Sequence, residues 1–282
     1  MTKWFSEKLY PSYAQSFGIK RVLFERNTGH QHLIIFENED MGNVMALDGI
    51  IQTTERDEFM YHEMLAHVPL FAHHNPKKVL IIGGGDGGIA REVVRHKQIE
   101  RIVQVEIDQA VIDMAREYFP RHSNGAFDDP RLEIVIEDGF RFVHETDEKF
   151  DVIISDSTDP VGPGEVLFTN DFYRGVRRCL NDKGIFAAQN GVAFMQPEEV
   201  TNTWRRFEGI FADRWFYVVP VPTYVGGFMT LAWGSLDTTA RQLPIETIEQ
   251  RFHDSGIETR YYTPEVHKAA FALPRYILDL LH

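Results

Sequence analysis

The first 55 residues contain short runs of β-branched and aromatic residues, separated by Gly and by Asn or Asp. This pattern predicts strands over Ile19–Glu25, Gln31–Glu37 and Asn43–Leu47. Two apolar runs flank Asp48-Gly49, a pair that readily adopts the positive φ angles of a tight hairpin turn. We therefore expect a small antiparallel β unit at the start of the chain.

From Thr54 the pattern changes to apolar residues at helical spacing, and strand-like and helix-like runs then alternate. After a first helix (Phe59, Met60, Met64, Leu65 and Val68 on its apolar positions), the expected strands are Lys78–Ile82, Arg101–Glu106, Leu132–Ile136 and Phe150–Ser155. The helices between them are Gly88–His96, Gln109–Tyr118 and Gly139–Glu145. Later strands are expected over Gly184–Gln189 and Gly227–Trp233, and later helices over Glu198–Phe211, Ile245–His253 and at the C-terminus. This alternation predicts parallel strands with right-handed crossovers, hence a doubly wound α/β sheet.

Composition narrows the class of protein. The 282 residues carry 29 Lys and Arg against 42 Asp and Glu, a net charge of −13, which argues against nucleic-acid binding. No apolar run approaches the roughly 18 residues of a membrane-spanning helix, and no secretory signal is visible, so we expect a cytoplasmic protein. The single cysteine excludes a disulfide framework and a cysteine-based metal site. Residues 61–160 hold 19 acidic and 11 basic side chains, so the negative charge is concentrated there.

The ends of the predicted parallel strands carry the candidate chemistry, because ligands of open α/β sheets bind beyond the carboxyl ends of the strands. The first strand is followed by Gly83–Gly88, which satisfies G-x-G-x-x-G and includes Gly83, Gly85 and Asp86. Glu106 ends the second strand, where an acid can accept hydrogen bonds from ribose hydroxyls. Asp138-Gly139 follows the third predicted strand, and Asp156 and Asp159 follow the fourth. Together these positions predict a nucleoside site.

The carboxylates at these strand ends separate two kinds of nucleoside. A dinucleotide would place its pyrophosphate near Asp86, Asp156 and Asp159, which would repel it. A cationic sulfonium nucleoside with an amine co-substrate suits the same carboxylates. The sequence therefore favours an adenosyl-sulfonium ligand over NAD.

Five segments of the sequence resemble bacterial spermidine synthases, the polyamine aminopropyltransferases. They are GGGDGG, VEID, EDG, DSTDPVGP and IIQTTERDEFMYHEM, and the resemblance extends over essentially the whole chain. It implies a Rossmann-like (class I methyltransferase-like) doubly wound sheet with a small N-terminal antiparallel β domain, divided into residues 1–55 and 56–282. It also implies transfer of the aminopropyl group of decarboxylated S-adenosylmethionine to putrescine, giving spermidine and methylthioadenosine, by at least a homodimer. No prosthetic group or metal is expected.

The resemblance also assigns site residues. It implies that the nucleoside is bound by Gln31, Glu106, Asp138, Gly139 and Pro163, beside the glycine loop. It implies that the amine is bound by His62, Asp86, Asp156 and Asp159, with further contacts from Gln52, Tyr61 and Tyr224. Asp156 is implied to be the proton acceptor. An ordinary Asp, with a pKa of about 3.9, is a poor match for an ammonium of pKa about 10.4. We therefore infer that the sulfonium charge helps to lower the pKa of the amine, and that Asp156 with Tyr61 or a water removes the proton.

Other interpretations stay open at this point. His62-Glu63 with His67 is one residue longer than the H-E-x-x-H zinc signature, so we do not predict a metal site there. A putrescine N-methyltransferase, or a non-catalytic protein that binds a polyamine or an adenosyl nucleoside, would share much of this pattern. The amine could also be spermidine, agmatine or cadaverine. Residues 158–167, with two Pro and two Gly, are a candidate gate over the pocket.

Overall fold

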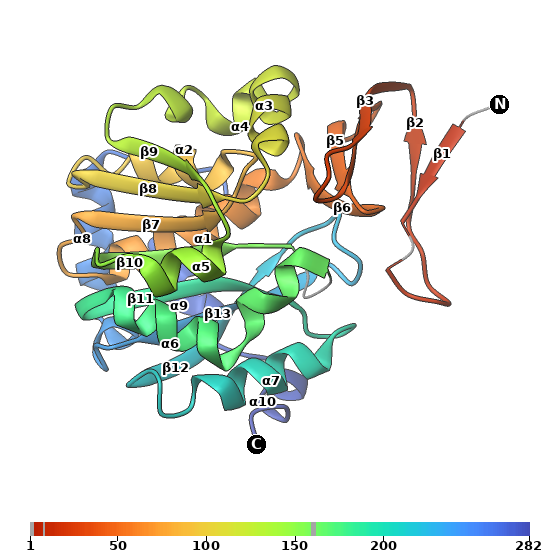
Figure 1. Cartoon of the computed structure of the whole chain (residues 1–282). Helices are drawn as coiled ribbons and strands as arrows, with labels where there is room; N and C mark the ends of the chain where they lie inside the picture. The colour runs from red at the N-terminus through yellow and green to blue at the C-terminus, as the bar shows by residue number, and fades with distance from the viewer. Residues whose placement is uncertain (1–2, 8, 159–161) are drawn as a thin grey trace.

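The computed structural model describes residues 3–7, 9–158 and 162–282 of the chain. Two antiparallel sheets of two and four strands lie together at the N-terminal end, drawn at the right of Figure 1. Their strands are β1 (Lys3–Ser6), β2 (Ser16–Ile19), β3 (Arg21–Asn27), β4 (His32–Asn38), β5 (Gly42–Leu47) and β6 (Ile50–Thr54). The predicted N-terminal β unit is present, and β1 and β2 are additional strands that the sequence pattern did not indicate.

The hairpin predicted at Asp48-Gly49 joins β5 to β6. Asp48 has a φ of 49° and Gly49 a φ of 82°, as a turn with two left-handed residues requires. The Asp48 carboxylate also accepts a hydrogen bond from the backbone N–H of His32 at 2.8 Å. The turn thus fixes the register of β4, β5 and β6 together.

The larger part of the chain is built on a seven-stranded mixed sheet, with the order β12-β13-β11-β10-β7-β8-β9. Its strands are β7 (Lys78–Gly83), β8 (Arg101–Glu106), β9 (Leu132–Ile136), β10 (Phe150–Asp156), β11 (Leu180–Val192), β12 (Asp213–Pro220) and β13 (Phe228–Ser235). The five strands from β9 to β11 are mutually parallel, and β13 runs antiparallel to both of its neighbours. The doubly wound sheet is confirmed.

Strand β12 was not predicted. Its sequence WFYVVP is a continuous apolar run, which periodicity alone does not distinguish from a buried helical segment. Such a run is typical of a strand covered on both faces. The predicted helix Glu198–Phe211 ends earlier than expected, at Phe207, and Gly209 shortly after it has a φ of 71°, which helical residues do not adopt.

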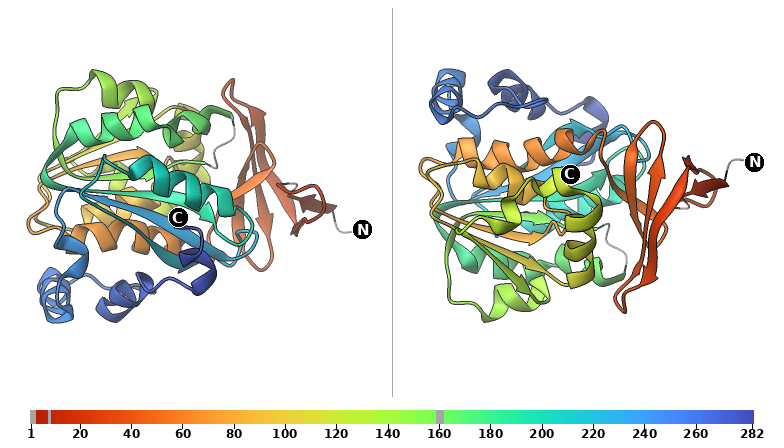
Figure 2. Two further views of the ribbon diagram at one scale, coloured as in Figure 1. Left: turned by 90° about the horizontal axis from the view of Figure 1, so that it is seen from below. Right: turned by 90° about the horizontal axis from the view of Figure 1, so that it is seen from above.

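Helices cover both faces of the large sheet, as the two views of Figure 2 show. The α-helices are α1 (Glu58–Ala72), α2 (Gly88–Val94), α3 (Gln109–Tyr118), α4 (Pro120–Ser123), α5 (Gly139–Glu145), α6 (Asn170–Cys179), α7 (Pro197–Phe207), α8 (Ile245–Ser255), α9 (Pro264–Ala270) and α10 (Arg275–Leu278). The 3₁₀ helices within the described residues are η1 (Ala126–Asp128), η2 (Gly162–Phe168) and η3 (Ala240–Gln242). Helices α1, α2, α8 and α9 lie on one face, and α5, α6 and α7 lie on the other.

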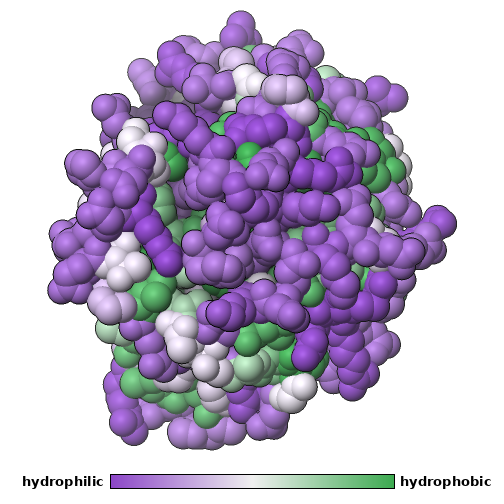
Figure 3. Space-filling model, turned by 90° about the vertical axis from the view of Figure 1, so that its left-hand side faces the viewer, coloured by the Kyte–Doolittle hydropathy of each residue, from purple (hydrophilic) through white to green (hydrophobic). Residues whose placement is uncertain are grey.

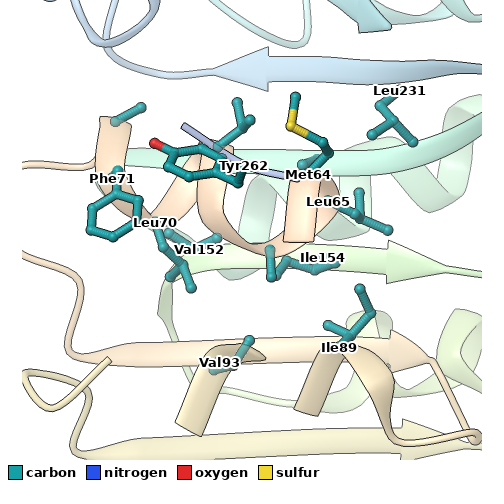
Figure 4. Packing of buried hydrophobic residues seen from close by; sticks show 14 of the residues in the cluster. Met64, Leu65, Leu70, Phe71, Ile89, Val93, Val152, Ile154, Leu231 and Tyr262 are labelled. Atoms are coloured by element: carbon teal, nitrogen blue, oxygen red, sulfur yellow. The ribbon is translucent and has the colours of Figure 1, made fainter. Parts of the chain in front are cut away.

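Helix α1 is the centre of the first face. It contacts β10, β11 and β12 on one side and α2 and α8 on others, so 13 of its 15 residues are buried. Figure 4 shows Leu65 and Leu70 of α1 close to Val152 and Ile154 of β10. Helix α1, which follows directly after the N-terminal sheets, is therefore also part of the core beneath the seven-stranded sheet.

The end of the molecule opposite the N-terminal sheets is mainly hydrophilic, as Figure 3 shows. Among the helices of the described ranges, none combines the length and the apolar character needed to cross a bilayer.

Candidate active site

Strands β7 and β10 are neighbours, and the chain order of the sheet reverses between them, which is the ligand-binding point of open α/β sheets. Their ends are joined by a hydrogen bond from the Gly84 N–H to the Asp156 carbonyl oxygen at 2.9 Å. Gly83 has a φ of 81°, and a Cβ there would lie 2.1 Å from the same carbonyl oxygen. Only glycine at this position allows the two strand ends to come so close.

The predicted site residues meet in one cavity between the carboxyl ends of the parallel strands and the N-terminal sheet. Those that line it are Gln31, Gln52, Tyr61, His62, Gly83, Gly85, Asp86, Glu106, Asp138, Gly139, Asp156 and Tyr224. Asp159 lies outside the described residues. The backbone of Pro163 belongs to η2, and nothing is described of its side chain. Gly164 and Leu167 of η2 also line the cavity, so part of the segment 158–167 borders it, and its role as a gate stays a prediction.

One end of the cavity has groups suited to a nucleoside. Glu106, at the end of β8, is 7% exposed and accepts a hydrogen bond from the Asp108 N–H at 3.0 Å. The Gln31 side chain donates to Asp108 at 3.2 Å. Asp138 caps α5 by accepting from the Phe140 N–H at 2.8 Å, so it has a structural role whether or not it also binds a ligand.

The other end of the cavity is lined by carboxylates and phenols. The Tyr61 hydroxyl donates to Asp156 Oδ1 at 2.6 Å. His62 Nε2 lies 3.2 Å from Asp86 Oδ2, and Asp86 also accepts from the Gly88 N–H at 2.9 Å. The Tyr224 hydroxyl donates to the Gln52 carbonyl oxygen at 2.7 Å, which joins the N-terminal hairpin to the loop between β12 and β13.

The environment shifts the carboxyl pKa values in this cavity in opposite directions. Burial and the nearby charge of Asp86 raise the pKa of Asp156 to about 6. Asp86 is also buried, but the adjacent His62 holds its pKa below the ordinary value, so Asp86 is the one that stays ionised. Burial raises the pKa of Glu106 to about 7. Asp156 is consequently a much better proton acceptor than an ordinary aspartate.

One ligand atom from each of His62, Asp86 and Asp156 lies within 4.8 Å of the other two. This spacing can enclose a cation. A metal ion would need the lone pair of a His62 nitrogen, but each ring nitrogen already faces a carboxylate oxygen, Glu58 on one side and Asp86 on the other. An alkylammonium, which donates hydrogen bonds to carboxylates, fits the two aspartates better than a metal does.

Four residues around the site were missed by the sequence analysis. Glu58, four positions before His62, could have been found as an i, i+4 partner on the same helix face. Asp108 caps α3 and orients both Glu106 and Gln31, and its position before a helical run was a usable signal. No local sequence signal pointed to Arg91 or Gln104. Gln104 lies on β8, and its side chain donates to the carbonyl oxygens of Gly83 and Gly84 at 3.0 and 2.7 Å.

Two family models match the chain. Residues 58–242 match the spermine/spermidine synthase domain, and residues 3–55 match the spermidine synthase tetramerisation domain. Together they span both the large sheet and the N-terminal sheets.

Similar proteins and structures agree with these matches. The chain is 61% identical over 277 residues to polyamine aminopropyltransferase 1 of Pseudomonas aeruginosa, covering 98% of this chain and 97% of that protein. It is 60% identical over 278 residues to a polyamine aminopropyltransferase of Pseudomonas syringae pv. tomato, covering 99% and 97%. A crystal structure of a spermidine synthase in complex with the transition-state analogue AdoDATO superposes with a TM-score of 0.94 at 41% identity, covering 100% of this chain and 96% of that one. The chain therefore belongs to the spermine/spermidine synthase family.

Proposed function

We propose that this protein transfers the aminopropyl group of decarboxylated S-adenosylmethionine to putrescine and so forms spermidine and methylthioadenosine. The observation that carries the proposal is the single cavity onto which both Glu106 with Asp138 and Asp86 with Asp156 open. The first pair suits a nucleoside, and the second suits an alkylamine cation. The sulfonium compound is a co-substrate, and the chemistry requires no prosthetic group.

In the proposed reaction, the amine nitrogen attacks the carbon next to the sulfonium. The new C–N bond forms as the C–S bond breaks, and the bonding electrons leave with sulfur as a neutral thioether. The proton of the attacking amine passes to Asp156, whose raised pKa and hydrogen bond from Tyr61 prepare it as the acceptor. The cavity holds both cations in line, which lowers the entropic cost of their meeting.

The remaining residues are proposed to bind and orient the two reactants. Those proposed for the co-substrate are Gln31, Gly83, Gly85, Asp86, Glu106, Asp138, Gly139 and Pro163. Those proposed for the amine, besides Asp156, are Gln52, Tyr61, His62, Asp86 again, Asp159 and Tyr224. Asp86 supplies a reason for the choice of co-substrate. The carboxylate of intact S-adenosylmethionine would face this ionised aspartate, whereas the decarboxylated compound has no such charge.

The test is to incubate the protein with each form of the co-substrate and a panel of di- and triamines and to identify the products by mass. We expect spermidine from putrescine, only with the decarboxylated form. N-methylputrescine from intact S-adenosylmethionine would replace the proposal with a methyltransferase. Binding of both ligands without any product would indicate a binding protein, and a larger product from another amine would change the substrate.

We also propose that residues 1–55 and 56–282 are two domains and that copies of the chain associate, at least as a homodimer, through the first. Support comes from the tetramerisation-domain match over residues 3–55. Light scattering on the full chain would give the number of copies. A cytoplasmic location is proposed as well, supported by the single buried thiol of Cys179, which suits a reducing compartment. Cell fractionation would test it.

A further inference from the structure

We propose that Glu58, anchored by Arg91, is a positioning residue that keeps His62 as an imidazolium, and that this cation makes the amine site release the proton of the bound amine. This inference rests on the proposed aminopropyl transfer. Neither Glu58 nor Arg91 lines the cavity, so both act through His62.

The geometry around the imidazole ring carries the argument. His62 Nδ1 lies 2.6 Å from Glu58 Oε2, one helical turn earlier on α1, and His62 Nε2 lies 3.2 Å from Asp86 Oδ2. An ionised carboxylate can only accept hydrogen bonds. Each ring nitrogen must therefore carry a hydrogen, and an imidazole with two N–H groups is positively charged.

The ring is also held in place sterically. His62 is 2% exposed, and a Cβ on Gly88 would lie 2.2 Å from its Nδ1 and Cε1 atoms. The glycine at the start of α2 therefore leaves room for this ring, which lies between α1 and the glycine loop. Burial by itself opposes the charge, but Asp86 and Glu58 together raise the pKa of His62 well above its ordinary value.

Arg91 of α2 keeps Glu58 ionised and oriented. Its guanidinium donates to both Glu58 oxygens, at 2.8 and 3.2 Å, and also to Glu92 at 2.7 Å and to the carbonyl oxygen of His122 at 3.0 Å. Burial of Glu58 opposes its ionisation, but the contacts with His62 and Arg91 lower the pKa of Glu58 to about 2. Glu58 thus remains an acceptor over the whole working pH range.

The charged and titratable groups that face His62 come from four elements and the glycine loop. They are Glu58 and Tyr61 on α1, Asp86 in the loop, Arg91 on α2, His122 on α4 and Asp156 on β10. Burial lowers the pKa of His122, so it stays neutral, and burial with the charge of Asp156 keeps Tyr61 a phenol. The cations His62 and Arg91 then balance the anions Glu58 and Asp86. Glu92, which Arg91 also contacts, is paired with Arg95 at 2.7 Å. Asp156 is left as the one carboxyl facing His62 that has no cationic partner among these groups, which makes it the group that takes the proton.

This balance matters because the nucleophile must be a neutral amine. If His62 were neutral, Asp86 and Asp156 would both stabilise the bound ammonium, and deprotonation would require a higher pH. The imidazolium offsets the negative charge of Asp86, while the oxygens of Asp86 can still accept hydrogen bonds from the amine. The bound amine therefore loses its proton more readily.

The test compares Glu58→Gln with wild type by NMR of the His62 ring and by the pH dependence of turnover. In wild type we expect the ring to stay doubly protonated through pH 8; in Glu58→Gln it should titrate between about pH 5 and 8. The acidic limb of the turnover profile should move up by about one pH unit, from about 6 towards 7, with a roughly twofold loss at pH 7. Glu145→Gln is the matched control: it removes the same charge from an i, i+4 pair, with Arg141, on the surface, and should leave both readouts unchanged.

Two results would overturn the inference. One is a wild-type His62 that titrates at or below its ordinary pKa of about 6.5, a measurement that needs no variant to fold. The other is a Glu58→Gln enzyme whose turnover falls equally at all pH values, as expected from a purely structural role. The NMR titration uses no substrate, so it stays informative even if the product panel shows that the protein performs a different reaction.

Discussion

At the scale of single residues, this site gives three carboxyl groups different pKa values by their surroundings alone. The neighbouring His62 lowers the pKa of Asp86 and so keeps it ionised. Burial beside Asp86 raises the pKa of Asp156 to about 6. Burial at the end of β8, where backbone N–H groups donate to it, leaves Glu106 with a pKa of about 7. An aspartate that titrates near pH 6 can accept a proton and release it again to solvent. The proposed division of roles follows from position in the fold rather than from residue type.

Asp156→Asn should lower turnover by at least about a hundredfold, because the amide cannot accept the amine proton. In wild type, turnover should fall as the pH drops through about 6, where Asp156 becomes protonated. Steady-state rates across pH 5–9 check both statements. Methylthioadenosine affinity, measured by calorimetry, is the control and should not change. Near-normal turnover in the variant would remove Asp156 from the role of acceptor.

Glu106→Gln should weaken methylthioadenosine binding about ten- to a hundredfold, because hydrogen bonds from the ribose hydroxyls to a charged acceptor are lost. Binding favours the carboxylate form, so wild-type affinity should rise with pH through about 7, and the variant should show no such rise. Calorimetric titrations at pH 6, 7 and 8 measure this. If only the amine affinity changed, the division of the cavity into two halves would be wrong.

The same substitution should stabilise the ligand-free fold. The pKa of Glu106 is about 7 in the folded protein against 4.5 for the unperturbed side chain, so its favourable contribution is complete below pH 4.5 and is lost as the pH rises to 7. Above pH 7 the buried charge costs about 3 kcal/mol, which glutamine avoids. Urea unfolding should show a gain for Glu106→Gln at pH 8 and none at pH 4.5. A loss of stability at pH 8 would contradict the buried charge.

At the scale of elements, α1 unites the core and the site. Its N-terminal half carries Glu58, Tyr61 and His62, and the next turn packs Leu65 against the sheet (Figure 4). Tyr61 and His62, both proposed to contact the amine, are therefore held by the same helix that fills the centre of one face of the large sheet. Precision of the site depends on this packing, since a side chain is only as well placed as the element that carries it.

Leu65→Ala should destabilise the protein by about 2–5 kcal/mol, because Leu65 is fully buried and the surrounding elements cannot collapse around the cavity. Urea unfolding measures the change. Phe194→Ala is the control: its side chain is 72% exposed, so its truncation should change stability by less than about 0.5 kcal/mol. A loss of under 1 kcal/mol for Leu65→Ala would show that α1 can repack.

The pattern of elements explains what could be predicted from sequence. The parallel strands were visible because each pairs a short apolar run with a polar or glycine residue at its end, as in Ile82-Gly83 and Val105-Glu106. Strand β12 was not visible, because its apolar run ends in Val219-Pro220, without a polar or glycine residue. Within the site, Glu106 and Asp156 could be placed by strand position. Arg91 and Gln104 act through contacts between elements distant in sequence, which no local pattern records.

At the scale of the whole molecule, the net charge of −13 is uneven, and its most acidic part, residues 61–160, holds the four described carboxyls that line the cavity from the strand ends. A field of this sign attracts small cations and raises their rate of encounter. Ionic strength should weaken this attraction, since the screening length falls to about 10 Å at 0.1 M salt.

We therefore expect kcat/KM for the diamine to fall several-fold when salt is raised from 0.01 to about 0.5 M, since the screening length shrinks over that range. Methylthioadenosine is uncharged and serves as the internal comparison; its affinity should change less than about twofold. Initial rates at limiting diamine, with the co-substrate saturating, provide the measurement. Equal changes for both ligands would point to an effect of salt on the protein rather than on the approach of the cation.

The hydrogen bond between Tyr61 and Asp156 joins positions 95 residues apart, and it forms only where β10 lies beside β7. A chain that emerges from its N-terminus presents Tyr61 and His62 long before their partners exist. Since closing so distant a contact is slow, the complete pocket is a late product of folding. Bound methylthioadenosine should then slow unfolding while leaving the rate of refolding unchanged. The ligand would thus lengthen the lifetime of the folded enzyme without changing how fast the chain folds.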